Sequence, residues 1–479
     1  MLFNSLQFLI FFPAVVLLYW FLPGRIRNWM LLFASYYFYM CWQPVYALLI
    51  LFSTVTTWAG ARIIGSSSGT SRRKAVLTGV LTVNFAILFC YKYLGFFGGE
   101  IIGLMRRLGL AISVPEFDIL LPVGISFYTF QAVGYIVDVW RHTIKPEKSL
   151  ATYALFVSFF PQLVAGPIER ARNLLPQFHT HHIFSSRALI KGLEMMALGY
   201  FMKLCIAENV APYVNAVFNN LPQHNGNSVL LAAIFFTFQI FCDFGGYSLI
   251  AIGAARCMGF HLMQNFRQPY LAPSIKEFWR RWHISLTTWF TDYVYIPLGG
   301  SRVSNKRHLG NLMATFRLSG LWHGANYTFI AWGGYNGTLL CIQAIHTKLN
   351  KKHAAQNRKR SAWIDKILKL FNIAVTFLLV VIGWIFFRAN SLQDAFMALK
   401  KIATERGMLY NGEGKPAIAL SLLLIVALMA VEVHSERASK RKVRKDFSVT
   451  KSAIISAILL TVILLTARFE GGQFIYFQF

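Results

Sequence analysis

Charged side chains are scarce in this sequence. They make up 14% of its 479 residues, whereas hydrophobic residues make up 56%. Soluble proteins carry about 25% charged residues, so there is too little polar surface here to cover soluble domains of this total length. The long apolar runs are instead typical of a protein that crosses a membrane many times. The composition also excludes a disordered chain, a coiled coil and a secreted disulfide scaffold.

Acidic residues are especially few. Asp and Glu number 19 against 47 Lys and Arg, which gives a formal net charge of +28. In a soluble protein such an excess would indicate nucleic-acid binding. Here the strongest basic clusters lie between apolar runs, where positive charge sets the orientation of a membrane protein. We therefore expect the lipid bilayer as a partner and no nucleic acid.

Several catalytic and metal-binding motifs are missing. The six cysteines form no C-x-x-C pair, so neither a zinc site nor a disulfide framework is expected. The sequence contains no G-x-S-x-G elbow, no H-E-x-x-H helix and no P-loop. We therefore expect no bound metal and no covalently bound cofactor.

Apolar runs predict the fold class. After a first run that ends at Leu22, they lie near residues 28–41, 44–60, 75–97, 119–140, 151–165, 187–207, 228–258, 311–346, 366–388, 416–433 and 452–467. The first run lacks a basic start and a clear cleavage site, so we interpret it as a retained span. We expect one all-α domain over residues 1–479, a polytopic helical bundle of about ten to twelve spans with interfacial and re-entrant helices.

Basic loops predict the orientation of this bundle. Residues 62–74 and 348–360 contain Lys and Arg without an acid, and residues 437–451 contain Asp446 as their one acid. By the positive-inside rule these loops are cytoplasmic, and the mixed loop 389–415 lies outside. The same rule, applied to Arg25 and Arg27, places the N-terminus outside, and the tail after Arg468 then also lies outside.

Residues 261–310 are too polar to cross a membrane, yet they are rich in aromatic residues. This pattern predicts short amphipathic helices at the interface, packed against the bundle. A turn is expected at Pro297-Leu298-Gly299-Gly300-Ser301.

One histidine lies where an ionisable residue is costly. The 28 residues from Leu318 to Ile345 carry no formal charge, and His323 lies among them. Such a residue is a functional candidate, although a hydrogen-bonded structural histidine is an equally open interpretation. Asn326 and Tyr327 lie at i+3 and i+4 from His323, so their side chains are expected to meet it.

The glycines near His323 carry a second expectation. Gly320 and Gly324 share a helix face, which would let a neighbouring helix or a slim substrate approach the backbone. Basic residues precede the run at 302–317 and follow it at 348–360. The run is therefore predicted to be a hairpin broken at Gly333-Gly334, unless one basic loop is misassigned.

A second histidine, His283, lies between Trp282 and Ile284, and taken alone it would be an interfacial residue. Chemistry that rests on histidine alone fits transfer of an activated acyl group to a hydroxyl. A neutral imidazole takes the hydroxyl proton while a thiolate departs, and no covalent enzyme intermediate is required.

Four segments resemble the membrane-bound O-acyltransferase family. They are EFWRRWHISLTTWFTDYVYIPLGGSR from Glu277, SGLWHGANYTFIAWG from Ser319, PVGISFYTFQAVGYIVD from Pro122 and FPQLVAGP from Phe160. The resemblance extends over the whole chain. Within the family, the sequence is most similar to the branch of alginate O-acetyltransferase membrane subunits, and D-alanyl transfer proteins of teichoic acids are more distant.

The resemblance implies a helical bundle with a thin centre, a donor bound from the cytoplasm and an acceptor that enters from the opposite face. It identifies His323 as the catalytic histidine and His283 as the second family histidine. In the alginate-type branch, acetyl groups cross the bacterial inner membrane to periplasmic partner proteins, which acetylate an exopolysaccharide.

One motif departs from the branch. The branch usually reads roughly DFSGYSDMAIG, whereas residues 243–253 read DFGGYSLIAIG, with Gly245 for a serine and Leu249 for an aspartate. Asp243 and Tyr247 are retained, and both are candidates for substrate binding. The acceptor or partner therefore stays open.

The expected function is acetyl transfer from a thioester, with acetyl-CoA as the first choice of donor and an acyl-carrier protein as the second. Lys276, Arg280 and Arg281 are expected to bind donor phosphates, unless they only anchor the cytoplasmic side. Trp282, Asn326 and Tyr327 are further candidates for donor or substrate binding. The alternatives are transfer of D-alanyl or another acyl group, a transporter without chemistry, and a scaffold.

A partner outside the cytoplasm is also expected. Neither a charged donor nor a polysaccharide can enter hydrocarbon, so a separate extracytoplasmic protein would receive the acetyl group. It is predicted to dock near the aromatic tail that contains Phe474, Tyr476, Phe477 and Phe479.

Overall fold

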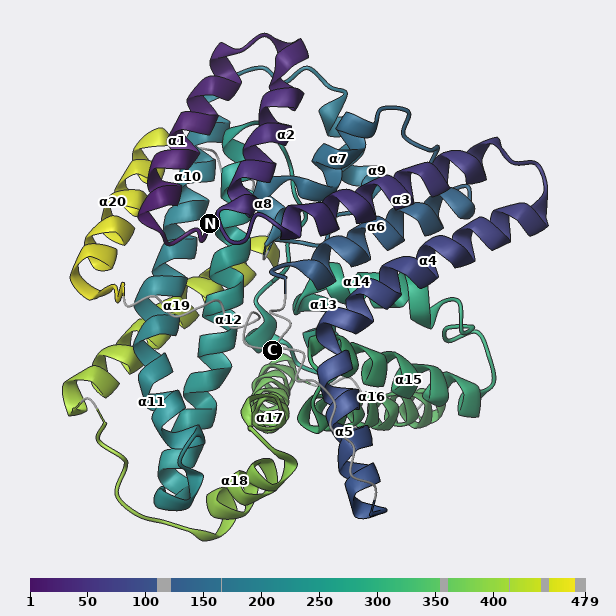
Figure 1. Ribbon diagram of the computed structural model, residues 1–479. Coiled ribbons are helices and arrows are strands. Elements are labelled where there is room, and N and C mark those ends of the chain that lie inside the picture. The colour runs from purple at the N-terminus through teal and green to yellow at the C-terminus, as the bar shows by residue number, and fades with distance from the viewer. Residues whose placement is uncertain (110–121, 165, 354–360, 413, 441–447, 470–479) are drawn as a thin grey trace. The chain divides into compact units, whose positions relative to one another are not determined.

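The computed structural model describes residues 1–109, 122–164, 166–353, 361–412, 414–440 and 448–469. Within these ranges every regular element is a helix (Figure 1), which confirms the predicted all-α class. The chain forms two compact units. Unit 1 consists of Met1–Leu198, Tyr247–Met263 and Val449–Ser456, and unit 2 of Gly199–Gly246, Gln264–Ser448 and Ala457–Phe479. The single-domain interpretation stays a prediction.

Unit 1 contains the N-terminal helices. They are α1 (Leu6–Phe21), α2 (Gly24–Met40), α3 (Tyr46–Ser66), α4 (Thr70–Lys92), α5 (Leu94–Arg107), α6 (Ile125–Trp140), α7 (Leu150–Ser158), α8 (Phe160–Leu163), α9 (Ala171–Phe178) and most of α10 (Ser186–Tyr200). Two long helices, α12 (Gly226–Cys257) and α20 (Val449–Thr466), contribute residues to both units.

Unit 2 contains longer helices and several short turns. They are the π-helical turn η1 (Phe201–Ala207), α11 (Glu208–Phe218), η2 (Leu221–Gln223), η3 (Pro269–Leu271), α13 (Ile275–Arg281), α14 (Ile284–Phe290), η4 (Thr291–Tyr295), α15 (Asn305–His323), α16 (Tyr327–His353), α17 (Ala362–Arg388), α18 (Leu392–Thr404) and α19 (Lys415–Lys440).

Six helices of the described chain are long and apolar enough to cross a membrane. They are Tyr46–Ser66, Thr70–Lys92, Gly226–Cys257, Trp363–Arg388, Lys415–Ser439 and Val449–Thr466. The first apolar run forms α1, whose 16 residues fall short of the ~20 that a crossing usually needs. The expected count of ten to twelve spans therefore stays a prediction.

Several buried polar side chains of unit 1 have hydrogen-bond partners. The Thr57 hydroxyl and the Tyr153 hydroxyl lie 2.8 Å apart, and Ser53 donates to the Asn84 side chain at 2.6 Å. The Gln131 amide donates to the Phe156 carbonyl at 2.7 Å. Because an unpaired polar group in an apolar interior costs several kcal/mol, these bonds make the apolar helices α3, α4, α6 and α7 compatible with burial.

Aromatic rings form the centre of unit 2. Trp384 of α17 lies 4.8 Å from Trp282, which follows α13, and 6.0 Å from Trp332 of α16, measured between ring centroids. Trp282 also stacks on Phe278 at 5.5 Å. These rings bury large apolar areas and fix α13, α16 and α17 against one another.

The segment 261–310 folds into short helices, as its composition predicts. It contains η3, α13, α14 and η4, followed by turns that include Gly299 and Gly300 at positive φ. Its rings are largely buried inside unit 2; Trp282, for example, is 1% exposed. A position at the membrane interface stays a prediction.

The run 311–346 is a helical hairpin, but it does not break where the sequence suggested. The α15 helix ends at His323 and α16 begins at Tyr327, so the turn is residues 324–326 and Gly333-Gly334 lies inside α16. A Cβ on Gly320 would lie 2.2 Å from the Phe329 carbonyl oxygen, and one on Gly333 would lie 2.4 Å from that of Phe316. These glycines therefore permit close contact between the two helices, and Gly333 does not end a helix.

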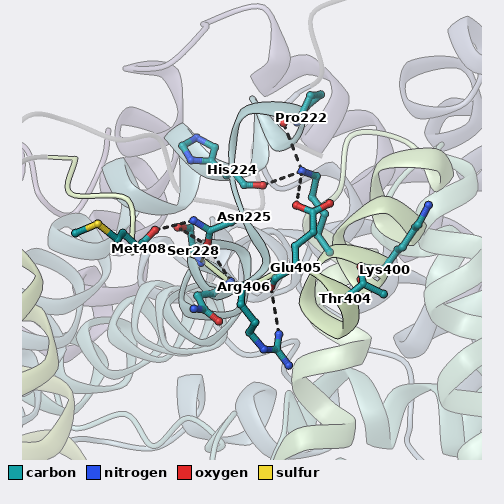
Figure 2. Close-up of polar contacts among 11 residues, drawn as sticks. Pro222, His224, Asn225, Ser228, Lys400, Thr404, Glu405, Arg406 and Met408 are labelled. Carbon is teal, nitrogen blue, oxygen red and sulfur yellow. Dashed lines mark hydrogen bonds and ion pairs between the residues drawn. The ribbon is translucent and has the colours of Figure 1, made fainter.

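The end of α18 and the chain after it are bonded to the segment that precedes α12 (Figure 2). The Lys401 ammonium donates to the His224 carbonyl at 2.9 Å and pairs with Glu405 at 3.0 Å. The Asn225 side chain donates to the Met408 carbonyl at 2.6 Å. The predicted outer loop 389–415 thus contains the helix α18, followed by residues that are hydrogen-bonded to the chain before α12.

The two adjacent glycines of α16 provide a test of the hairpin contact. Gly333→Ala should lower the thermal unfolding midpoint of the detergent-purified protein, because its methyl group would collide with the Phe316 carbonyl, at a cost of roughly 1–3 kcal/mol. Gly334→Ala is the matched control, since nothing lies within 4 Å of its Cβ and alanine favours a helix. Equal midpoints for the two variants would contradict this account.

Candidate functional site

Both histidines singled out from the sequence line one cavity in unit 2. Its volume is about 490 Å³, and we call it the histidine cavity. Its walls come from α13, α14, η4, α15 and α16. The other polar side chains on the wall are Lys276, Arg280, Thr287, Thr291, Tyr295, Ser301, His308, Thr315, Ser319, Gln343 and Thr347.

His323 is held by aromatic rings at the end of α15. Its ring centroid lies 5.0 Å from that of Trp332 and 5.2 Å from that of Phe387, both nearly perpendicular to the imidazole. The residue is 5% exposed. Ser319, one turn earlier on the same helix, also lines the cavity. The imidazole is therefore fixed by contact on several sides while it faces the cavity.

His283 is held by its backbone. It has φ 41° and ψ 55°, a left-handed conformation that few non-glycine residues adopt, and it immediately precedes α14. Asn265 holds the chain here: its carbonyl accepts from the Ile284 N–H at 2.9 Å and its side chain accepts from the Ser285 hydroxyl at 2.6 Å. The Phe244 ring contacts the imidazole at 4.6 Å between centroids. Such strain persists where neighbours impose it, as they do at functional sites.

Burial also determines the charge of His283. The residue is 1% exposed, and burial lowers the pKa of its imidazole to about 3. It is therefore neutral near pH 7.

The indole of Trp322 lies against both histidines. Its ring centroid is 6.0 Å from that of His283 and 4.9 Å from that of His323. The tryptophan itself is 4% exposed. One buried ring thus contacts the two imidazoles of the cavity, which come from segments 40 residues apart in the sequence.

The two predicted donor-binding arginines lie in different places. Arg280 lines the histidine cavity with a 65% exposed side chain, and Lys276 lines it as well. Arg281 is 13% exposed; its guanidinium pairs with Glu277 at 2.9 Å and with Glu436 at 3.2 Å, and it is not part of the cavity wall. Trp282 does line the cavity and is itself 1% exposed.

Asn326 and Tyr327 lie in and just after the hairpin turn. The Asn326 side chain accepts from the Thr328 N–H at 3.0 Å and so caps α16. Because α15 ends at His323, the i+3 and i+4 relation of a continuous helix does not form here. Neither residue belongs to the cavity wall, and a role in binding stays a prediction for both.

Asp243 forms part of a buried ion cluster. The Lys203 ammonium lies 2.6 Å from a carboxylate oxygen of Asp243 and 2.6 Å from one of Glu208. All three side chains are at most 11% exposed. The sequence analysis did not predict Lys203 as a functional residue, although a lysine inside the apolar run 187–207 is the kind of residue that indicates one.

Tyr247 belongs to unit 1, where its ring stacks on Phe3 at 5.3 Å between centroids. The aromatic tail with Phe474, Tyr476, Phe477 and Phe479 lies outside the described residues. Substrate binding by Tyr247 and docking at the tail stay predictions.

Residues 147–385 match the model of the membrane-bound O-acyltransferase family. The matched region includes both histidines and every residue of the histidine cavity.

Similar proteins include a probable alginate O-acetylase of Azotobacter vinelandii, 39% identical over 400 residues that cover 83% of this chain and 77% of that protein. A peptidoglycan O-acetyltransferase of Helicobacter pylori is 31% identical over 444 residues, which cover 85% of this chain and 81% of the relative. A teichoic acid D-alanyltransferase of Bacillus subtilis is 28% identical over 288 residues, 57% of this chain and 70% of the relative.

Proposed function

Because the chain belongs to the membrane-bound O-acyltransferase family, we propose that it transfers an acetyl group from a cytoplasmic thioester for O-acetylation of an exopolysaccharide such as alginate. The similarity to a probable alginate O-acetylase supports both the acetyl group and the polymer class. Similarity to a peptidoglycan O-acetyltransferase supports acetyl transfer to an envelope polymer more generally.

The observation that carries the proposal is the histidine cavity. It connects exposed basic side chains, Lys276 and Arg280, with two buried imidazoles, His283 and His323. A thioester donor has the same two ends, namely a charged phosphate portion and an uncharged reactive carbonyl. The cavity therefore suits a donor whose phosphates remain in water while its thioester reaches the histidines.

In the proposed reaction, His323 is the general base. Its imidazole accepts the proton of the acceptor hydroxyl while the hydroxyl oxygen attacks the thioester carbonyl carbon. The carbon–sulfur bond then breaks, and the thiolate leaves and takes up a proton. The C-terminal end of α15 carries partial negative charge, which stabilises the imidazolium that forms at this last helical residue.

The second imidazole has a different role in this proposal. His283 is neutral, since burial lowers its pKa to about 3, so it is a poor base and a good uncharged donor. We assign it an N–H donated to the thioester carbonyl oxygen, where negative charge develops in the transition state. Its fixed backbone would hold that donor in place before the substrate arrives.

Acetyl-CoA is the proposed donor, with an acyl-carrier thioester as the second choice. Lys276 and Arg280 are proposed to bind its phosphates, while Arg281 is already paired with two carboxylates. The 28% identity to a teichoic acid D-alanyltransferase favours D-alanyl as the alternative acyl group.

The proposed location is the bacterial inner membrane, with both termini outside the cytoplasm. An extracytoplasmic protein is proposed to receive the acetyl group, because neither the donor nor the polymer can enter hydrocarbon. Residues of α18 and of the chain after it, all in loop 389–415, are bonded to the segment that precedes α12 (Figure 2), so we do not propose this loop as the group that receives acetyl.

Replacing His323 tests the reaction directly. His323→Ala should lower the rate of acetyl-ester formation by ~10²–10⁴-fold, the usual effect of removing a positioned acid–base group. A chromatographic assay of acetyl esters measures it. The control is His346→Ala on α16, a histidine that is exposed and outside the cavity wall.

Near-normal acetylation by a well-expressed His323→Ala protein would exclude the assigned role and favour a transporter or scaffold.

His283→Asn is the companion variant, because asparagine tolerates the left-handed backbone that alanine does not. It should impair turnover with the fold retained.

Adjacent arginines separate donor binding from stability. Arg280→Gln should raise the KM for acetyl-CoA by roughly two- to five-fold, the value of one exposed charge pair, with an unchanged unfolding midpoint. Arg281→Gln should lower the midpoint, because it removes the buried guanidinium that pairs with both Glu277 and Glu436, and should leave KM near the wild-type value. The reverse pattern would contradict the assignment.

Reconstitution tests the proposed partner. Liposomes that contain the purified chain, acetyl-CoA and polysaccharide should give little acetylated polymer, and addition of extracytoplasmic proteins from the same cells should restore it. Acetyl esters on the polymer can be quantified by chromatography. Efficient polymer acetylation by the chain alone would show that no partner is needed.

A further inference from the structure

Unit 1 contains a second large cavity, of about 450 Å³, at the turn between α1 and α2. We call it the basic pocket. One wall consists of Tyr19 and Pro23 with Gly24, Arg25, Arg27 and Asn28 at the start of α2, and the other is residues 178–182 at and after the end of α9. The proposed reaction uses none of these residues.

The wall of the basic pocket carries charge of one sign. Arg25 and Arg27 line it, together with His179, His181 and His182, and no Asp or Glu belongs to its described wall. Glu147 bonds to His179 with 2.8 Å between Nε2 and the carboxylate oxygen. Within the described chain, neither arginine takes part in an ion pair, so their positive charge is available to a ligand.

Arg27 is held in place before any ligand arrives. Its Nε donates to the Leu22 carbonyl at 3.0 Å and its Nη1 donates to the His182 carbonyl at 2.9 Å. The guanidinium carbon also lies 5.0 Å from the Tyr19 ring centroid and 5.2 Å from that of Trp20. A guanidinium fixed in this way loses little further entropy when it binds a phosphate.

Large apolar side chains surround the pocket and face outward. Phe21 is 84% exposed, Trp29 52%, Ile183 81% and Phe184 54%. Along α1 and α2 the outward faces continue with exposed residues such as Leu17 and Phe33. In a multi-pass membrane protein exposed apolar faces suit lipid, and basic side chains between them suit the level where acyl chains end and head groups begin.

We infer that the basic pocket binds the phosphate of an anionic phospholipid head group, with the apolar side chains around it contacting the acyl chains. The cations supply charge-assisted hydrogen bonds to phosphate oxygens, as basic pockets between membrane helices do. A free phosphate or the phosphates of the acyl donor share this chemistry. The exposed apolar rim favours the lipid, because a soluble anion makes no use of it.

Native mass spectrometry of the full chain in detergent tests the inference, with phosphatidylglycerol as the probe and phosphatidylcholine as its zwitterionic counterpart. The wild type should retain phosphatidylglycerol preferentially. Arg25→Gln/Arg27→Gln should reduce that retention at least five-fold. The matched control is Arg106→Gln/Arg107→Gln, which removes the same charge from two exposed arginines of the same unit.

A second pair of substitutions and a competition experiment separate loss of lipid binding from unfolding and from binding of a soluble anion. If loss of Arg27 unfolds the protein, Arg25→Gln/His181→Gln replaces two exposed side chains of the same wall and should show the same selective loss. Inorganic phosphate and CoA, added in excess, should not displace the lipid. Equal retention by pocket and control variants would overturn the inference, and so would displacement by either soluble anion.

Discussion

Backbone contact between α15 and α16 is the constraint on which the histidine cavity depends. The helices approach so closely that Gly320 lies against the Phe329 carbonyl and Gly333 against that of Phe316. Both helices line the cavity, α15 through Ser319 and His323 among others and α16 through Leu340 and Gln343. Side chains larger than hydrogen at Gly320 and Gly333 would push apart the two helices that line the cavity.

The two imidazoles are oriented in different ways, one by side-chain packing and the other by backbone conformation. His323 ends a helix and is surrounded by rings, so its orientation follows from side-chain packing. His283 has a backbone conformation that is unfavourable for most residues, and bonds from Asn265 to the next two residues impose it. Trp322 contacts both imidazole rings and so links the packing around His323 to the packing around His283. Precise catalytic geometry requires such support from neighbouring residues, because small displacements of the reacting groups are costly in rate.

Sequence patterns predicted the helical class, the hairpin and the short aromatic helices of 261–310, because each leaves a signal in composition or local spacing. Both histidines were found because a titratable side chain in an apolar run, or in a motif, is conspicuous. Failures arose where long-range contacts decide the outcome. The hairpin turns at 324–326 because Asn326 caps α16 there, whereas Gly333 serves interhelical contact. Arg281 looks equivalent to Arg280 in sequence, but it is buried and pairs with the distant Glu436.

The buried cluster of Lys203, Glu208 and Asp243 has a consequence for how the chain enters the bilayer. A single Lys or Asp at the centre of a helix adds about 2.5–3.5 kcal/mol to the free energy of insertion. Lys203 follows α10 and Asp243 lies in α12, so each segment carries such a penalty until the two charges meet at 2.6 Å. The penalty favours joint insertion of these neighbouring segments, with the ion pair formed during synthesis. A chain that lost either charge would leave the other segment to carry its insertion penalty without this ion pair.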